Sequence, residues 1–475
     1  MSQKKKEISF TLSLIPLVVM IVAMGFTIIQ FEGSPHIPLI LGTMVAGVIA
    51  WLKGFTAVEI EESIYKGIRH ALPAIVIIIL VGLIIGAWIG GGVVPSLIYY
   101  GLQLISPSWF LVSISVLCAI VAISIGSSWS TMATMGVAGM GVGISLGIPE
   151  GMIAGAIISG SYFGDKMSPL SDTTNLASGI AGADLFEHIK HMLHTTIPAF
   201  IITLIVYAWM GSSFSTDSIE SEQVAAVLKG LEQHFVISPW LLLIPLTVIV
   251  LVIFRVPALP ALCVGVMLGF LSHVFIQPGT IGEAVVVLHD GYAFESHIVM
   301  LNELLNRGGI ESMMYTVSLT IVAMTFGGVL EETGMLRAIV MKIISFAKTS
   351  RSLVVTTIGS AFFTNLTASE QYMSVILPAR MYTEAYDKMN LHPKNLSRAV
   401  EDGGTLTSVF IPWNTCGVFI IATLGVHPFV YAPYAILNII VPILSIIFAI
   451  TGYTIAKKQN VQPVSPDPSE SSQSA

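Results

Sequence analysis

Two long hydrophobic segments of this chain are each interrupted by charged residues, hydroxyl side chains and helix breakers. The first interruption is GDKMSPLSDTTN, residues 164–175, and the second is EDGGTLTSVFIPWNT, residues 401–415. Asp165 and Glu401 are 236 positions apart, and Ser171 and Ser408 are 237 apart, so the two interruptions occupy equivalent places in two halves. Irregular backbone at membrane depth persists mainly where it is buried in protein or lines a watery cavity. A matched pair of broken segments is therefore typical of a secondary transporter.

The composition places most of the chain in lipid. Hydrophobic residues make up 54% of the 475 residues and charged residues 10%, whereas a soluble domain carries roughly 25% charge. This indicates an all-α polytopic membrane protein. Cys118, Cys263 and Cys416 lie in apolar runs without metal-binding or disulfide spacing, and we expect no cofactor. The apolar run 8–31 is too long for a signal peptide and predicts a retained first helix.

Hydropathy repeats in the same order in the two halves. The first half has apolar stretches at 9–31, 36–53, 71–91, 108–147, 150–182 and 195–212, and the second has them at 238–254, 258–277, 309–330, 352–378, 395–424 and 431–456. Segments 56–70 and 280–306 mix charged with apolar residues and predict surface or interfacial helices. We therefore divide the chain into a first repeat, an external linker, a second repeat and a disordered cytoplasmic tail: 1–212, 213–237, 238–456 and 457–475.

Stretches 108–147 and 352–378 each carry a small polar tip between apolar arms. The tips are GSSWST at 126–131 and TNLTASE at 364–370. Each stretch is either a full crossing or a re-entrant hairpin, and hydropathy alone does not decide between them. If both are hairpins, each half crosses the membrane five times. Because five is odd, the halves would insert with opposite orientations.

The distribution of basic residues tests this arrangement. With the amino terminus in the cytoplasm, eighteen of the 21 Lys and Arg residues fall inside, Lys229 and Arg307 fall outside, and Lys166 lies in the membrane. This obeys the positive-inside rule. The sequence thus predicts two inverted repeats, each with five crossings, one re-entrant hairpin and one broken helix, and both termini in the cytoplasm.

The first interruption and the residues after it also carry a family resemblance. GSYFGDKMSPLSDTTNLAS at 160–178, followed by DLFEHIKHMLHTTIP at 184–198, resembles the signature of the NhaC family of bacterial sodium/proton antiporters, within the ion-transporter superfamily. The resemblance covers the chain except for the tail and 213–236. It implies a multi-pass antiporter of the bacterial cytoplasmic membrane that exchanges sodium for protons by alternating access. The same family contains sodium- and proton-coupled malate/lactate exchangers, so small carboxylates remain an alternative substrate, and a homodimer stays open.

Other classes of protein fit less well. An ATP-driven pump needs a phosphate-binding loop, and GxxxxGK[ST] is absent. No HExxH motif of an intramembrane protease is present, and we expect no enzyme activity. We also find no feature of nucleic-acid binding in the sequence. A carboxylate site needs cations or N–H donors, and Lys166 is the only basic residue that we place at membrane depth.

Sodium is a hard cation that prefers oxygen ligands, including the carbonyls of unwound helices. The interruptions and tips offer hydroxyl and amide oxygens in both halves. The candidate substrate-binding residues are Ser128, Ser130, Thr131, Ser168, Ser171, Thr173, Asn175, Thr364, Asn365, Thr367, Thr405, Thr407, Ser408 and Asn414. Of these, Ser171 and Asn175 flank Asp172, and we predict that these three residues hold the sodium ion.

Proton exchange needs a carboxylate that is ionised with the cation and protonated without it. The candidate coupling residues are Asp165, Asp172 and Glu370, with Glu401 and Asp402 behind them. Each has a structural alternative. Asp165 can be neutralised by the adjacent Lys166, and Asp172 can cap the helix that follows it. Glu401 and Asp402 can form a solvated ion pair with Arg398 near the cytoplasmic face.

Three histidines recur at every third residue in a predicted cytoplasmic loop: His188, His191 and His194. Histidine titrates near physiological pH, so the cluster is a candidate pH sensor. Interfacial residues beside Lys190 explain it equally well. The i, i+3, i+6 spacing drifts around a helix, which argues against a metal site.

Overall fold

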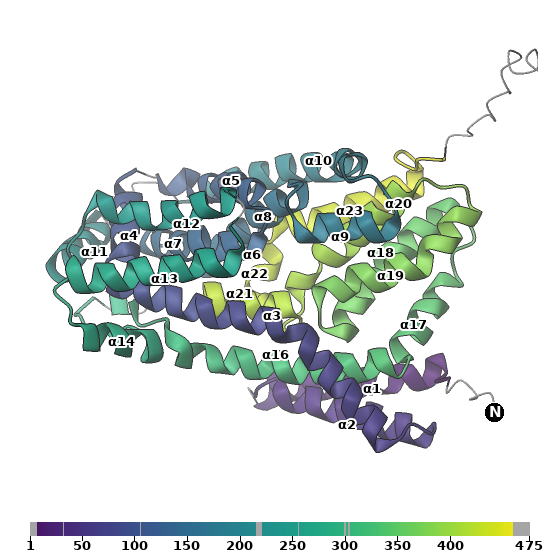
Figure 1. The fold of residues 1–475 in the computed structure, drawn as a ribbon. Coiled ribbons are helices and arrows are strands. Elements are labelled where there is room, and N and C mark those ends of the chain that lie inside the picture. Colours follow the sequence, from purple (N-terminus) through teal and green to yellow (C-terminus); the bar gives the residue numbers. More distant parts are fainter. Residues whose placement is uncertain are drawn as a thin grey trace, which may run out of the picture.

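The computed structural model describes residues 7–458, except 32, 105, 215–220, 255, 299–300 and 303–304. These residues form an elongated bundle of helices (Figure 1), with one isolated antiparallel bridge between Leu391 and Lys457. The predicted tail from 459 onward lies outside the described residues. The all-α prediction is confirmed for the described part of the chain.

The first half contains helices on both sides of the first interruption. They are α1 (Phe10–Phe31), α2 (His36–Leu52), α3 (Ala57–Gly90), α4 (Val93–Leu104), α5 (Pro107–Ile125), α6 (Ser128–Thr131), the π-helix η1 (Met132–Gly136), α7 (Val137–Ser145), α8 (Glu150–Met167), α9 (Asp172–Ala181) and α10 (Leu185–Gly211). The predicted break falls between α8 and α9, and the first tip consists of the two residues after α5 together with α6.

The second half begins after a further helix, α11 (Ser221–His234), within the predicted linker. Its elements are η2 (Pro239–Leu242), α12 (Leu243–Ile253), α13 (Ala258–Phe275), α14 (Ile281–Asp290), α16 (Gly309–Glu332), α17 (Met335–Ile344), α18 (Ser350–Ala368), α19 (Gln371–Lys388), α20 (Pro393–Val400), the π-helix η3 (Glu401–Thr405), η4 (Ser408–Phe410), α21 (Thr415–Leu424), α22 (Pro428–Tyr431), η5 (Ala432–Tyr434) and α23 (Ile436–Thr451). The second tip consists of the end of α18 and the two residues before α19.

One surface helix predicted from the sequence is not separate. Segment 56–70 forms the beginning of α3, which continues unbroken to Gly90. Thr56 and Glu59 form a capping box that starts the helix, and Pro73 sits inside it without ending it. The charged residues before position 70 are therefore an extension of a membrane helix, and the prediction of an independent element was wrong.

Glycines allow the long helices α3 and α16 to pack side by side (Figure 1). A Cβ atom at Gly82 would lie 2.5 Å from the carbonyl oxygen of Gly309, and one at Gly67 would strike Met324. Small residues at helix interfaces are typical of membrane proteins. Since α3 belongs to the first half and α16 to the second, this contact joins the halves.

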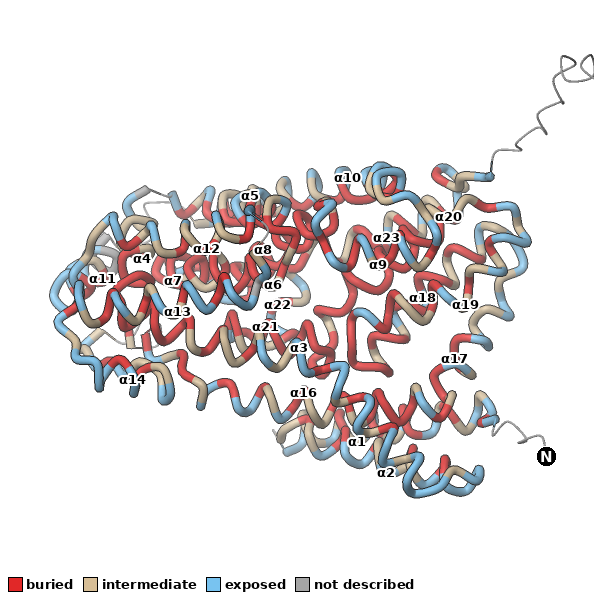
Figure 2. The backbone as a smooth tube through the Cα atoms, in the orientation of Figure 1, coloured by how far each residue is buried: buried red, intermediate tan, exposed pale blue. Residues whose placement is uncertain are grey.

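Large apolar side chains are exposed on the outside of this bundle, as expected of a protein in lipid, and its interior contains both apolar and polar side chains. Among the described residues, five helices are long and apolar enough to cross a membrane, namely α1, α3, α5, α10 and α16, and three bent helix pairs raise the number to as many as eight. Figure 2 shows buried backbone through the middle of the molecule and exposed positions along its outside. Large exposed apolar side chains include Phe26, Leu52 and Trp209.

Candidate functional site

The first tip and the first interruption are joined by hydrogen bonds to a buried carboxylate. The backbone N–H and the hydroxyl of Ser128 donate to Oδ2 of Asp165, over 3.0 and 2.6 Å. Ser168, in the interruption, donates its hydroxyl to the carbonyl of Ile123, at the end of α5, over 2.7 Å. Asp165 is only 3% exposed. The first tip therefore packs directly against the first interruption.

The second tip and the second interruption are joined through amide side chains. Nδ2 of Asn365 donates to the carbonyl of Gly404 over 2.6 Å and lies 3.1 Å from the hydroxyl oxygen of Thr407. Asn414 donates to Oδ1 of Asn365 over 3.1 Å. All of these residues are buried. Each half therefore has a contact between its tip and its interruption. A carboxylate makes this contact in the first half, and amide side chains make it in the second.

The two interruptions also contact each other. Nζ of Lys166 lies 2.5 Å from Oδ1 of Asp402, and both side chains are 0% exposed. The hydroxyl of Thr173 donates to Oε1 of Glu401 over 3.1 Å. Lys166 and Asp402 are 236 positions apart, the same spacing that relates Asp165 to Glu401. Equivalent positions of the two halves therefore meet in one buried network.

Two of the structural alternatives are overturned by this network. Lys166 pairs with Asp402 across the interface between the halves, not with its neighbour Asp165. Glu401 and Asp402 are fully buried, so they are not a solvated ion pair. The physical reason is that α20 and η3 pack among α18, α19 and α9, inside the bundle.

Arg398 is the functional candidate that the sequence did not reveal. Its side chain is 0% exposed, and Nε lies 3.9 Å from Oδ2 of Asp402, too far for a hydrogen bond. None of its guanidinium nitrogens has a hydrogen-bond partner. Lys166 is therefore not the only basic side chain buried among the described residues. The signal available in the sequence was the i, i+4 spacing of Arg398 and Asp402.

Buried acids outnumber buried bases in the described part of the chain. Asp165, Glu370, Glu401 and Asp402 are at most 5% exposed, and they are opposed by Lys166 and Arg398. Several oxygens near this cluster are buried without a hydrogen-bond partner: Oδ1 of Asp165, Oε2 of Glu401 and Oγ1 of Thr405. Carboxylate and hydroxyl oxygens that are unpaired, buried and in excess of positive charge are suited to receive a cation or a proton.

The predicted sodium ligands around Asp172 have other partners in this structure. Oδ2 of Asp172 accepts a 2.5 Å hydrogen bond from the hydroxyl of Tyr372, and Asp172 is exposed. Asn175 is also exposed, and its amide donates to the carbonyls of Pro169 and Ser171. Ser171, not Asp172, caps α9 by accepting from the N–H of Thr174. The prediction that Asp172 caps this helix was therefore wrong, since the N-cap is the residue before it.

The remaining candidates serve local structure in this state. Glu370 caps α19 by accepting from the N–H of Met373 over 2.8 Å. Hydroxyls that donate to a carbonyl of their own segment are those of Thr131, Thr364, Thr367, Thr407 and Ser408. Ser130 is buried, and its backbone N–H donates to Ser127 at the start of α6. These residues shape the tips and breaks that hold the central carboxylates.

Two of the three clustered histidines are interior residues. His188 is 0% exposed and His191 is 6% exposed, whereas His194 is exposed. Nδ1 of His188 lies 2.8 Å from the hydroxyl oxygen of Ser397, on α20. The interfacial explanation therefore holds only for His194. His188 links α10 to the helix that carries Arg398.

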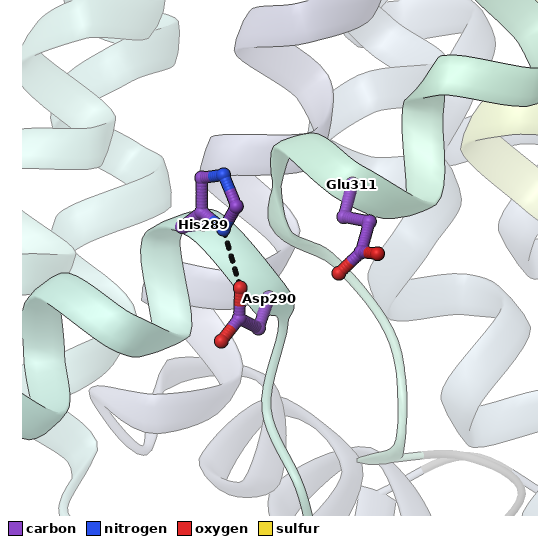
Figure 3. Close-up of side chains that lie close together, drawn as sticks. All are labelled: His289, Asp290 and Glu311. Carbon is purple, nitrogen blue, oxygen red and sulfur yellow. Dashed lines mark hydrogen bonds and ion pairs between the residues drawn. The ribbon is translucent and has the colours of Figure 1, made fainter.

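A second group of acidic and imidazole side chains lies at the surface. His289, Asp290 and Glu311 bring potential metal-ligand atoms within 4.8 Å of one another, and all three residues are exposed (Figure 3). The hydrogen bond that the imidazole of His289 donates to the carboxylate of Asp290 raises the pKa of His289 above its usual value. Because a metal binds the neutral imidazole, this interaction opposes coordination. The buried network is the better candidate site.

Similarity to known proteins shows the family of this chain. Residues 160–453, which include both interruptions and the second tip, match the Na+/H+ antiporter family. The chain belongs to this family. Asp165, Lys166 and Asp402 all lie between residues 160 and 453. The buried network is therefore inside the region that matches the Na+/H+ antiporter family.

Three members of known name are similar over nearly their whole length. The Na+/H+ antiporter NhaC of Alkalihalophilus pseudofirmus is 37% identical over 460 residues, covering 97% of this chain and 99% of that protein. The malate-2H+/Na+-lactate antiporter of Bacillus subtilis is 37% identical, covering 91% and 93%. The arginine/ornithine antiporter ArcD of Halobacterium salinarum is 36% identical, covering 96% and 94%. The NhaC resemblance seen in the sequence is confirmed.

Proposed function

We propose that this protein is a secondary active antiporter that exchanges sodium ions for protons across the bacterial cytoplasmic membrane. The observation that carries the proposal is the excess of buried carboxylates over buried cations at the junction of the two interruptions. In a medium of low dielectric, such an excess is costly unless a positive charge enters. A sodium ion and a proton can each supply that charge, so they compete for one place.

Asp165 and Glu401 are the groups to which we assign this competition. Each is fully or almost fully buried and has one carboxylate oxygen without a hydrogen-bond partner. The carboxylates lie close enough to repel each other electrostatically. A sodium ion between them would be completed by hydroxyls such as that of Thr405. Protonation of either acid would remove the repulsion without the ion.

The geometry favours Asp165 over Asp172 and Glu370 as the coupling residue. Asp172 is exposed and its carboxylate is held by Tyr372. Glu370 is buried but caps α19. Asp172 lies near Asp165 and repels it, so we assign Asp172 to the path by which ions approach, with Ser171 and Asn175 supporting its loop.

Alternating access would require the two halves to move as inverted repeats, 1–212 and 238–456. Support for this comes from the charge distribution and from the arrangement in Figure 1, where α11 and α14 lie at one end of the bundle and the beginning of α1 and the end of α23 lie toward the other. We propose that the end with α11 is external and that both termini are cytoplasmic.

Exchange of small carboxylates is the second candidate function. Arg398 favours it, because a buried guanidinium without hydrogen bonds can bind a carboxylate in a bidentate manner. The malate/lactate relative supports this reading at the same identity as NhaC. Sodium/proton exchange remains the better supported function, since the buried charge excess is negative.

Purified protein in liposomes containing a pH-sensitive dye tests both functions. Under the first proposal, an inward sodium gradient alone drives protons out of the lumen, and malate or lactate has no effect on the rate. A response that requires malate or lactate would establish the second function. Liposomes that respond to neither addition would refute both, provided that the protein is folded and inserted.

A further inference from the structure

Arg398 is among the largest fully buried side chains of the protein, yet its three guanidinium nitrogens lack hydrogen bonds. Leaving charged donors buried and unpaired is costly, and most buried polar groups in proteins are paired. The nearest carboxylate, Asp402, is already held by Lys166. The hydroxyl of Thr195 also lies 3.3 Å from the Asp402 oxygen that faces Arg398. Arg398 therefore stands beside a partner that is occupied in this state.

The turn type of the backbone explains why Arg398 and Asp402 do not meet. In an uninterrupted α-helix, residues at i and i+4 are neighbours, and Arg and Asp at this spacing form ion pairs. Here α20 ends at Val400 and the π-helix η3 begins at Glu401. A π turn pairs residues i and i+5, so Asp402 is displaced from its position one α turn above Arg398. The Nε to Oδ2 distance is 3.9 Å, within the range of an ion pair but beyond that of a hydrogen bond.

We propose that Arg398 is a positioning residue that replaces Lys166 as the partner of Asp402 during the transport cycle. Lys166 comes from the first half of the chain, whereas Arg398 and Asp402 share one helical segment of the second half. Relative movement of the halves pulls Lys166 away from Asp402 but carries Arg398 with it. Conversion of the π turn to an α turn brings Arg398 and Asp402 into direct contact. This inference rests on the proposed alternating access.

The exchange of partners keeps each buried charge compensated. Breaking a buried ion pair without a substitute is strongly destabilising, and a resident arginine removes that barrier. Lys166, once released, stays in the first half with the carboxylate of Asp165, its neighbour in the chain. Gly403 follows Asp402, and a Cβ there would lie 2.7 Å from the carbonyl of Ile358, so a residue without a side chain is needed where η3 packs against α18. The swap thus needs only groups already in the network.

A double-mutant cycle on thermal unfolding of the purified full-length protein tests the proposal without any transport. Lys166→Met should be tolerated because Arg398 then pairs with Asp402. Arg398→Gln should cost little because Lys166 keeps its contact. The double variant leaves Asp402 unpaired, and its unfolding temperature should fall by more than the sum of the two single decreases.

Tyr207→Phe supplies the matched control for this cycle. Tyr207 is buried and its hydroxyl bonds to Ser159 and to the carbonyl of Tyr434, away from Asp402. Lys166→Met combined with Tyr207→Phe should show additive decreases. Additive decreases in the Lys166 and Arg398 cycle as well would overturn the proposal.

Transport provides an independent readout. Arg398→Gln should lower the maximal rate of sodium-driven proton movement by about tenfold or more, as expected when a buried charge loses its substitute partner, while the half-saturating sodium concentration changes little. Arg398→Lys should restore part of the rate. Wild-type turnover in Arg398→Gln would contradict the swap. A wild-type protein that moves no protons would refute the proposed function, and the unfolding cycle would still judge the partner exchange.

Discussion

Individual carboxylates differ in this protein chiefly by what surrounds them. Asp165 and Asp172 are seven positions apart in one interruption, and the sequence alone ranks them together. In the structure Asp165 is buried and accepts two hydrogen bonds from Ser128 on one oxygen, whereas Asp172 is exposed and bound to Tyr372. Burial makes the charge of Asp165 dependent on a bound cation in a way that the charge of an exposed group is not.

Asparagine at these two positions should therefore have unequal effects. Asp165→Asn keeps an oxygen for Ser128 but can carry neither the proton nor the charge, so sodium-driven proton movement should fall to the background of empty liposomes. Asp172→Asn should keep coupled exchange and mainly weaken the apparent sodium affinity. Rates in liposomes at several sodium concentrations measure both. Loss of coupling in Asp172→Asn with retention in Asp165→Asn would reverse the assignment.

At the scale of elements, close helix packing builds the platform for Asp165. Helices α5 and α8 lie against each other, and a Cβ at Gly160 would strike the carbonyl of Ser115, while one at Gly164 would strike that of Ala119. The glycines let the two backbones approach, which places Asp165 beneath the tip that follows α5. Packing of this kind is sensitive to a single methyl group.

Gly160→Ala should accordingly destabilise the protein by about 1–3 kcal/mol, the usual cost of overpacking. Gly179 on α9 is the matched control, because it too is helical but has nothing within 4 Å of the position that a Cβ would occupy. Gly179→Ala should be neutral or slightly stabilising. Thermal unfolding in detergent compares the two variants, and equal effects would show that the α5–α8 contact does not limit stability.

Hydropathy and helix breakers were sufficient to predict the interrupted helices and the polar tips, since these are local signals. The partner of Lys166 and the burial of Arg398 were not predictable, because both depend on contacts between segments more than 200 residues apart. The charges of segment 56–70 predicted a separate surface helix. In the structure this segment is part of α3, because no residue between Thr56 and Gly90 ends the helix.

At the scale of the whole molecule, the charge distribution predicts which end of the bundle faces the cytoplasm. Lys388, at the end of α19, and Lys229, in α11, belong to opposite sides in the proposed topology. Both are exposed in the structure. Neither position depends on the details of the site, so the orientation can be tested separately from the mechanism.

Cysteine labelling in intact cells measures this orientation. Cys263 is exposed and should first be replaced by serine, whereas Cys118 and Cys416 are buried and can remain. A membrane-impermeant maleimide should label Lys229→Cys in intact cells, and it should label Lys388→Cys only after the cells are opened. External labelling at position 388 would be incompatible with both termini in the cytoplasm.

The pairing of Lys166 with Asp402 also constrains how the protein is made. These residues are 236 positions apart, so at a synthesis rate of 5–20 residues per second the ribosome needs roughly 10 to 50 s to deliver the partner of Lys166. During that interval the nascent first half holds Asp165 and Lys166 at membrane depth without the second half. The buried ion pair can therefore form only after most of the chain has been synthesised.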